Sequence, residues 1–227
     1  MFVFNNILVR GKSSYSQCGE DLIVDFVFKN LLKIEKPSFL DIGANDPILF
    51  NNTFKLYRNG CSGINIDPNR ESIKLFNKKR RKDINVHCGI GSEKGIKDFY
   101  IFGNSMLNTF DSKVANIQGG VVATERVKVE TIANVLFRHQ YSAIPDFLSL
   151  DTEGMDEEIL KSIFSVSSQF GLPKVICVET IRKLDDSEWQ KNLELIEYLK
   201  DNGYTHHSDT FINSIFFHPH YLKVKIR

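Results

Sequence analysis

Two short apolar segments, each ending at an acidic turn, constrain this chain more than any other feature. Residues 38–42 form the first segment and run into a Gly-Ala-Asn-Asp turn, and residues 62–66 form the second, which Asp67 follows. Short apolar segments bounded by turn residues are typical of buried parallel strands. In a doubly wound α/β sheet, ligands lie outside the carboxyl ends of such strands. The two segments therefore predict the first two strands of a nucleoside-binding sheet.

The first turn indicates which cofactor the sheet binds. A dinucleotide pyrophosphate needs a G-x-G-x-x-G turn, because bare backbone N–H groups must approach the phosphates. Only Gly43 remains of that motif here, and Pro47 removes one N–H donor. Asp41 and Asp46 would repel a pyrophosphate, whereas they favour the ammonium and sulfonium groups of S-adenosylmethionine. The turn therefore favours S-adenosylmethionine as the cofactor.

The carboxylate that ends the second segment, Asp67, is placed to accept hydrogen bonds from both ribose hydroxyls. Dinucleotide sites share such a carboxylate, so Asp67 does not distinguish between the cofactors by itself. A structural alternative applies to Asp41 and Asp46, which can instead cap the helix that follows them.

A second pair of carboxylates is predicted at the same edge of the sheet. Residues 147–150 and 174–178 have the pattern of two further buried strands, which Asp151 and Glu179 end. We expect these strands to be neighbours, so that both carboxylates face the crevice that holds the methyl group of the cofactor. Glu153 adds a third acid close by.

These acids suit methyl transfer to a hydroxyl, which requires that the hydroxyl be oriented and its proton removed. Asp151, Glu153 or a histidine is a candidate general base. A second solution is a Mg²⁺ ion, for which Asp151 and Glu179 form the minimum ligand set. One structural alternative is that Asp151 caps the next helix. Another is that Glu179 pairs with Arg182 or Lys183.

Composition excludes several classes of partner. The net charge of the 227 residues is +1, which favours neither nucleic acid nor a membrane surface. No stretch reaches the roughly 18 apolar residues of a membrane span, and the first ten residues are too short and polar for a signal peptide. The chain has four cysteines, Cys18, Cys61, Cys88 and Cys177, and none of them are paired at C-x-x-C spacing, so a zinc site is not expected. A reducing, cytoplasmic setting is the simplest interpretation of these cysteines.

The histidines and the basic run at residues 78–82 are assigned to the surface. One of His206 and His207 is a candidate to reach the acceptor, but a surface position is favoured for both. The basic run is expected to form a solvated helix face. The alternative is a landing site for an anionic acceptor, such as a nucleotide-linked sugar.

Strands and helices alternate along the chain, and a hairpin closes it. We expect the strands at residues 38–42, 63–66, 84–88, 147–150, 174–178, 204–209 and 214–218, and helices between them at 52–58, 71–82 and 131–139. This alternation predicts one α/β domain over residues 1–227. The expected architecture is a three-layer sandwich around a mostly parallel sheet with a terminal antiparallel hairpin.

Three segments add to this pattern. An N-terminal helix is expected over residues 16–32, within a helical extension of residues 1–36. Strand-like runs are inserted over residues 95–130, and the polar segment 103–120 between them is a candidate lid or acceptor loop. Near the end of the chain, Ser187 is expected to cap a helix with an apolar stripe: Trp189, Leu193, Ile196 and Leu199.

Six short motifs, in this order and spacing, resemble the FkbM family of S-adenosylmethionine-dependent methyltransferases. The resemblance spans roughly residues 15–217. The motifs are Tyr-Ser-Gln-Cys-Gly-Glu-Asp at 15–21, Phe-Leu-Asp-Ile-Gly-Ala-Asn-Asp at 39–46, Gly-Ile-Asn-Ile-Asp-Pro at 63–68, Val-Lys-Val-Glu-Thr at 127–131, Leu-Asp-Thr-Glu-Gly at 150–154 and Val-Glu at 178–179.

The resemblance implies a Rossmann-like class I methyltransferase fold with a seven-stranded sheet. It also implies O-methylation of a hydroxyl, often on a sugar or a polyketide-type natural product, in polysaccharide or secondary-metabolite pathways. By that similarity four residues would hold the cofactor: Asp41, Gly43, Asn45 and Asp67. Asp151 and Glu179 would lie where related metal-dependent O-methyltransferases place their ligands.

Two residues depart from the family pattern. Pro47 stands where the family turn usually has glycine, which stiffens the loop. Asp67 stands where the family usually has glutamate, so its contact to the ribose is expected to be longer or bridged by water.

Three hypotheses remain open from the sequence. The first is an O-methyltransferase that acts on a small-molecule or nucleotide-sugar acceptor. The second is an NAD(P)-dependent oxidoreductase or epimerase of sugars, against which the missing glycines argue. The third is a non-catalytic binding protein that keeps a nucleoside fold.

Overall fold

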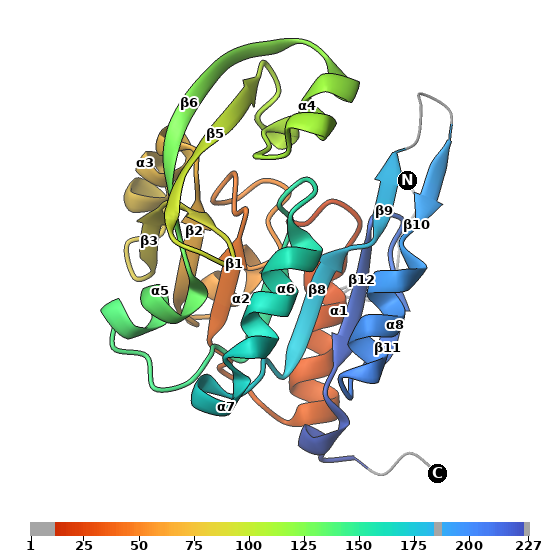
Figure 1. The fold of residues 1–227 in the computed structure, drawn as a ribbon. Coiled ribbons are helices and arrows are strands. Elements are labelled where there is room, and N and C mark those ends of the chain that lie inside the picture. The colour runs from red at the N-terminus through yellow and green to blue at the C-terminus, as the bar shows by residue number, and fades with distance from the viewer. Residues whose placement is uncertain (1–11, 184–187, 225–227) are drawn as a thin grey trace, which may run out of the picture.

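The computed structural model describes residues 12–183 and 188–224. Its main sheet consists of β1 (Phe39–Ile42), β2 (Gly63–Asp67), β3 (Ile84–His87), β7 (Phe147–Leu150), β8 (Val175–Glu179), β11 (Thr205–Asp209) and β12 (Asn213–Phe217). The strand order is β11–β12–β8–β7–β1–β2–β3 (Figure 1). The five strands from β8 to β3 are parallel, whereas β12 is antiparallel to both of its neighbours. The predicted sheet and its terminal hairpin are confirmed.

Alternate residues of the central strands bury their side chains on opposite faces of the sheet. On the face of Leu40 and Ile42, the core is completed by α5 (Ile132–Arg138), α6 (Asp156–Ser165), α7 (Ser167–Phe170) and α8 (Leu193–Asp201). On the face of Phe39, it is completed by α1 (Glu20–Phe26), the π-helical segment η1 (Val27–Leu32) and α2 (Phe54–Arg58). The result is the predicted three-layer sandwich.

Two small β-structures lie at the end of the sheet where the parallel strands have their carboxyl termini (Figure 1). One is a three-stranded sheet of β4 (Gly89–Ile90), β6 (Val121–Glu130) and β5 (Gly95–Phe102). Between β5 and β6 run the 3-10 turn η2 (Ser105–Leu107) and α4 (Ser112–Gln118). The other is a hairpin of β9 (Ile181–Lys183) and β10 (Trp189–Lys191).

The predicted start of the last helix is wrong. Trp189 lies in β10, where it pairs with Lys183 of β9, and Ser187 lies outside the described residues. The helix, α8, begins at Leu193, and the side chain of Asn192 caps it by accepting the N–H of Leu195 at 3.2 Å. The apolar spacing of Trp189 and Leu193 imitated a helical stripe, but pairing across the hairpin determines the backbone of Trp189.

The basic run at residues 78–82 is not wholly a solvated face, as the sequence had predicted. The helix α3 (Arg70–Lys79) ends within it, and Arg80 is fully buried. Its guanidinium lies over the rings of Phe39, Tyr57 and Phe76, with its carbon 5.0–5.3 Å from the ring centroids. The remaining four residues of the run are exposed.

Two other segments differ from the predicted boundaries. The N-terminal helix begins at Glu20 rather than at residue 16, because Gly19 at its N-cap has a left-handed backbone with φ 90°. The candidate lid contains a helix that its polar composition did not reveal, and Asp111 caps this helix by accepting the N–H groups of Lys113 and Val114. A 3-10 turn, η3 (Pro219–Tyr221), follows the last strand.

Over the described ranges, no helix has the combination of length and apolarity that crossing a bilayer demands. Cys61, Cys88 and Cys177 are buried and Cys18 is exposed, and all four are free thiols.

Candidate active site

A cavity of about 920 Å³ opens where the carboxyl ends of β1, β2, β7 and β8 meet. The predicted site residues that line it are Asp41, Gly43, Asn45, Asp67, Asp151, Glu153 and Glu179. Parts of the candidate lid, from Asn104 to Gln118, cover one side, and residues of the β9–β10 hairpin border another. The topology therefore brings together acids that lie up to 138 positions apart, from Asp41 to Glu179.

The turn after β1 requires glycine. Gly43 has φ 79°, and a Cβ built on it would lie 1.7 Å from the backbone oxygen of Asp151. The N–H groups of Gly43 and Ala44 both donate to the carbonyl oxygen of Ile66, at 3.0 and 3.2 Å. The bare backbone thus allows the turn after β1 to touch the end of β7, which closes the floor of the cavity.

Asp67 lies at the end of β2, as predicted. Its two carboxylate oxygens accept the backbone N–H groups of Asn45 at 2.8 Å and Asn69 at 2.7 Å. Burial raises the pKa of Asp67 to about 6, in spite of these hydrogen bonds. Each oxygen has a further lone pair, so the carboxylate can still accept hydrogen bonds from a ligand.

Asp41 is held from beneath the cavity. Its carboxylate accepts hydrogen bonds from Asn51 Nδ2 at 3.1 Å and Thr53 Oγ1 at 2.8 Å. The same two side chains also accept from Nη1 of Arg80, at 3.0 and 2.9 Å. Burial raises the pKa of Asp41 and the charge of Arg80 opposes that rise. Sequence reasoning missed Arg80, because it lies in a run of basic residues that resembles a surface.

Asp46 is the predicted site residue that the structure places outside the cavity lining. Its Oδ1 accepts the backbone N–H groups of Ile48 and Leu49, both at 2.8 Å. This pattern stabilises the turn after Pro47. The alternative that Asp46 caps the next helix is wrong, because α2 begins at Phe54 and its N-cap is Thr53.

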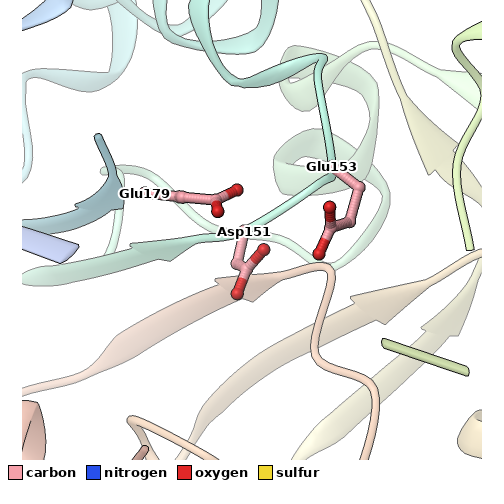
Figure 2. A group of neighbouring side chains, drawn as sticks. All are labelled: Asp151, Glu153 and Glu179. Carbon is pink, nitrogen blue, oxygen red and sulfur yellow. The ribbon is translucent and has the colours of Figure 1, made fainter. Parts of the chain in front are cut away.

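Three carboxylates converge at the carboxyl ends of β7 and β8 (Figure 2). Oxygens of Asp151, Glu153 and Glu179, called the acid trio below, all lie within 4.8 Å of one another. Within residues 12–183 and 188–224, their carboxylates have no hydrogen bond or ion pair. The N-cap of α6 is Met155, so Asp151 does not cap that helix. The side chains of Arg182 and Lys183 lie outside the described part of the chain, and their pairing with Glu179 stays a prediction.

Burial and mutual repulsion raise the pKa values of the acid trio. The pKa of Asp151 is raised to about 7, first by burial and then by the charges of nearby acids. For the same reasons the pKa of Glu153 is raised to about 8 and that of Glu179 to about 10. Without a positive charge nearby, the acid trio is therefore largely protonated at neutral pH.

The loop that carries Glu153 is tied to the candidate lid. Glu153 has a left-handed backbone with φ 52°, and its carbonyl oxygen accepts a hydrogen bond from Thr109 Oγ1 at 2.7 Å. On the other side of the cavity, Ser105 Oγ donates to Asn45 Oδ1 at 2.9 Å. The lid segment thus contacts the turn that carries Asn45 and the loop that carries Glu153. Nothing in the sequence had indicated these contacts.

Neither His206 nor His207 is among the described residues that line the cavity. His206 Nε2 lies 3.3 Å from Asp209 Oδ1, and the ring of His207 stacks on Phe26 with centroids 6.4 Å apart. The candidates for a general base are therefore reduced to the acid trio.

Comparison with known proteins identifies the family. The sequence profile of the Methyltransferase FkbM domain matches residues 41–205, which include the whole cavity floor. The chain belongs to this family. The predicted family is therefore confirmed, and with it the kind of domain, a methyltransferase domain. No curated protein sequence matches the chain.

Two solved structures are similar to this FkbM chain in fold. Methyltransferase FkbM from Methylobacillus flagellatus KT is 14% identical, with a TM-score of 0.48 over 81% of this chain and 44% of that one. The 1,6-didemethyltoxoflavin-N1-methyltransferase of Burkholderia thailandensis, with bound 1,6-didemethyltoxoflavin and S-adenosylhomocysteine, is 11% identical, with a TM-score of 0.45 over 88% of this chain and 75% of that one. The chain thus spans less than half of the Methylobacillus flagellatus protein.

Proposed function

We propose that this protein transfers the methyl group of S-adenosylmethionine to a hydroxyl of a small molecule, either a sugar or a natural product. The observation that carries the proposal is the acid trio beside the glycine turn of β1. Three carboxylates, for which the described part of the chain offers no hydrogen-bond or ion-pair partner, border a cavity of about 920 Å³, which is large enough for a cofactor and an acceptor together.

The floor of the cavity suits a cationic nucleoside rather than a dinucleotide. Gly43 allows the turn after β1 to lie against the backbone of Asp151, and Asp67 and the acid trio therefore border one cavity. Asp67 is placed to accept the ribose hydroxyls, and the acid trio favours the positive charge of a sulfonium group. A pyrophosphate in the same place would meet these carboxylates without compensation, which argues against the NAD(P)-dependent alternative. The open cavity also argues against a non-catalytic protein whose site is filled by its own side chains.

The acid trio supplies a general base. The sulfonium group makes the methyl carbon electrophilic, so the protein has to orient the acceptor hydroxyl and accept its proton. Asp151, whose pKa of about 7 in the free protein is the lowest of the three, is the member of the acid trio that most readily takes the ionised form that a base requires. Glu153 and Glu179 lie near Asp151, since carboxylate oxygens of all three lie within 4.8 Å of one another.

The donor set of the acid trio also suits a Mg²⁺ ion. Carboxylate oxygens are the ligands that Mg²⁺ prefers, and Asp151 and Glu179 with Glu153 offer three of them in one place. A bound ion would acidify and orient the acceptor hydroxyl. If a metal is needed, EDTA will abolish turnover and Mg²⁺ will restore it. Full activity in EDTA would leave the acid trio as a base alone.

Calorimetry and mass spectrometry test the proposed function. We expect S-adenosylhomocysteine to bind in the micromolar range and NADPH not to bind. With candidate acceptors, we expect a mass gain of one methyl group that is lost in Asp151→Asn, while Asp98→Asn on the exposed part of β5 serves as a matched control. Binding of NADPH alone would refute the proposal. A cytoplasmic setting remains part of it.

A further inference from the structure

The cavity has two sides that differ in their walls. Asp67 marks the cofactor side at the end of β2, and Glu179 marks the other side at the end of β8. These strands are separated by β1 and β7, so their ends are about 14 Å apart at a strand spacing of about 4.8 Å. If the ribose lies at Asp67, the region beyond Glu179 is left for the acceptor.

The wall beyond Glu179 is apolar and aromatic. Ile181 of β9, Trp189 of β10 and Ile212 from the turn between β11 and β12 all line the cavity there. The indole of Trp189 meets the ring of Phe211 edge-on, with centroids 6.1 Å apart, and keeps 48% of its surface exposed. An exposed indole that is held by a second ring presents a flat apolar surface at the mouth of an acidic cavity.

The charge of the lining disfavours an anionic acceptor. None of the lining residues in the described part of the chain is Lys, Arg or His. Six of the lining residues carry a carboxylate: Asp41, Asp67, Asp111, Asp151, Glu153 and Glu179. The basic run at 78–82 does not contribute, because Arg80 is buried and the others are absent from the lining. A phosphate at the acid trio would therefore lose its hydration in a partly buried place where no described lining residue offers it a positive charge.

We propose that the acceptor is an uncharged sugar ring that stacks its apolar face on Trp189 and directs a hydroxyl to the acid trio. Phosphorylated and nucleotide-linked sugars are then not substrates. This inference rests on the proposed function, and it replaces the open choice between free and nucleotide-activated sugars with a definite class. The C–H groups of a pyranose form a flat apolar face that matches an indole, while its hydroxyls suit carboxylate acceptors.

The fluorescence of the protein reports on this subsite directly, because Trp189 is the only tryptophan of the chain. The probes are methyl glycosides of glucose, galactose, mannose and rhamnose, and the 1-phosphates of the same four sugars. With S-adenosylhomocysteine at saturation, we expect at least one glycoside to shift the emission of Trp189. Each phosphate should bind at least tenfold more weakly than its matched glycoside. A phosphate that binds more tightly, or no shift with any glycoside, overturns the inference.

Kinetics on the glycoside that binds provide the second readout. Trp189→Ala is expected to raise KM for this acceptor at least tenfold with little change in kcat, and Trp189→Phe is expected to restore most of the loss. Phe137→Ala, an aromatic on α5 that is more exposed than Trp189 and lies outside the cavity lining, is the control. An unchanged KM in Trp189→Ala would show that the acceptor does not stack on Trp189. If the proposed function holds, Trp189→Ala binds S-adenosylhomocysteine as the wild type does, as measured by calorimetry, whether its KM for the acceptor is raised or unchanged.

Discussion

S-adenosylmethionine and S-adenosylhomocysteine differ by one methyl group and one positive charge, and we expect the acid trio to make their binding respond differently to pH. In the free protein, the pKa of Asp151 is about 7, because burial and neighbouring acids disfavour its charged form. A sulfonium about 4 Å from a carboxylate interacts with it by about 4 kcal/mol at an effective dielectric of about 20. Such an interaction lowers the pKa by about three units. Asp151 would therefore be ionised in the S-adenosylmethionine complex from about pH 4 upward.

The sign of the effect follows from proton counting. Below about pH 7 the free protein holds a proton on Asp151 that the complex does not, so binding releases it and affinity rises with pH. For a pKa that falls from about 7 to about 4, the gain is about tenfold between about pH 6 and about pH 8. S-adenosylhomocysteine carries the same ammonium group but no sulfonium, so its affinity lacks this gain.

The assay is calorimetric titration of both ligands at the two pH values, with the ratio of their dissociation constants as the readout. The ratio cancels any titration that both complexes share. We expect it to change about tenfold in the wild-type protein and to stay flat in Asp151→Asn. Asp98→Asn, which alters an exposed acid on β5, should behave as the wild type. A ratio that is the same at both pH values in the wild type would show that the sulfonium does not lie at the acid trio.

Three further substitutions test the floor of the cavity. Gly43→Ala should abolish binding of S-adenosylhomocysteine, because its Cβ collides with the backbone of Asp151; calorimetry measures this, and circular dichroism checks that the fold remains. Asp67→Ala should weaken binding of S-adenosylhomocysteine by about 1.5–3 kcal/mol, because the contact to the ribose is lost. An unchanged affinity would show that Asp67 does not contact the cofactor. Arg80→Met should lower the free energy of unfolding, measured in urea, by about 3–5 kcal/mol. The reason is that the buried carboxylate of Asp83 loses the Arg80 Nε that lies 2.7 Å from its Oδ2. The double variant Arg80→Met with Asp83→Asn should recover part of this loss of stability.

The positions of the site acids could be predicted because the topology of a parallel sheet is regular. Asp67, Asp151 and Glu179 each follow an apolar segment, and the carboxyl ends of neighbouring parallel strands meet at one edge. The period of the apolar residues was sufficient for this, since no contact between side chains had to be known. The convergence of Glu153 was less secure, as it depends on a left-handed residue in the turn after β7.

The elements that sequence reasoning missed are determined by contacts between distant segments. The β10 strand exists because it pairs with β9, and its apolar spacing alone resembled a helix. The helix α4 buries only Ala115, so it has no apolar stripe, and its cap at Asp111 lies within a polar segment without period. Propensity and period are local properties, and they do not report such pairing or capping.

Arg80 shows why charge is harder to predict than topology. Its burial depends on Asn51 and Thr53 from the loop before α2 and on Asp83 before β3, none of which are adjacent to it in the helix. The same network also determines which carboxylate of the cavity has a positive charge beside it and which has none when a ligand binds. The sequence assigned the cationic groups of the cofactor to Asp41, but Asp41 has hydrogen bonds from below and the charge of Arg80 to balance it. Among the described residues the acid trio has neither, so we expect a positive charge on the ligand to have its largest effect there rather than at Asp41.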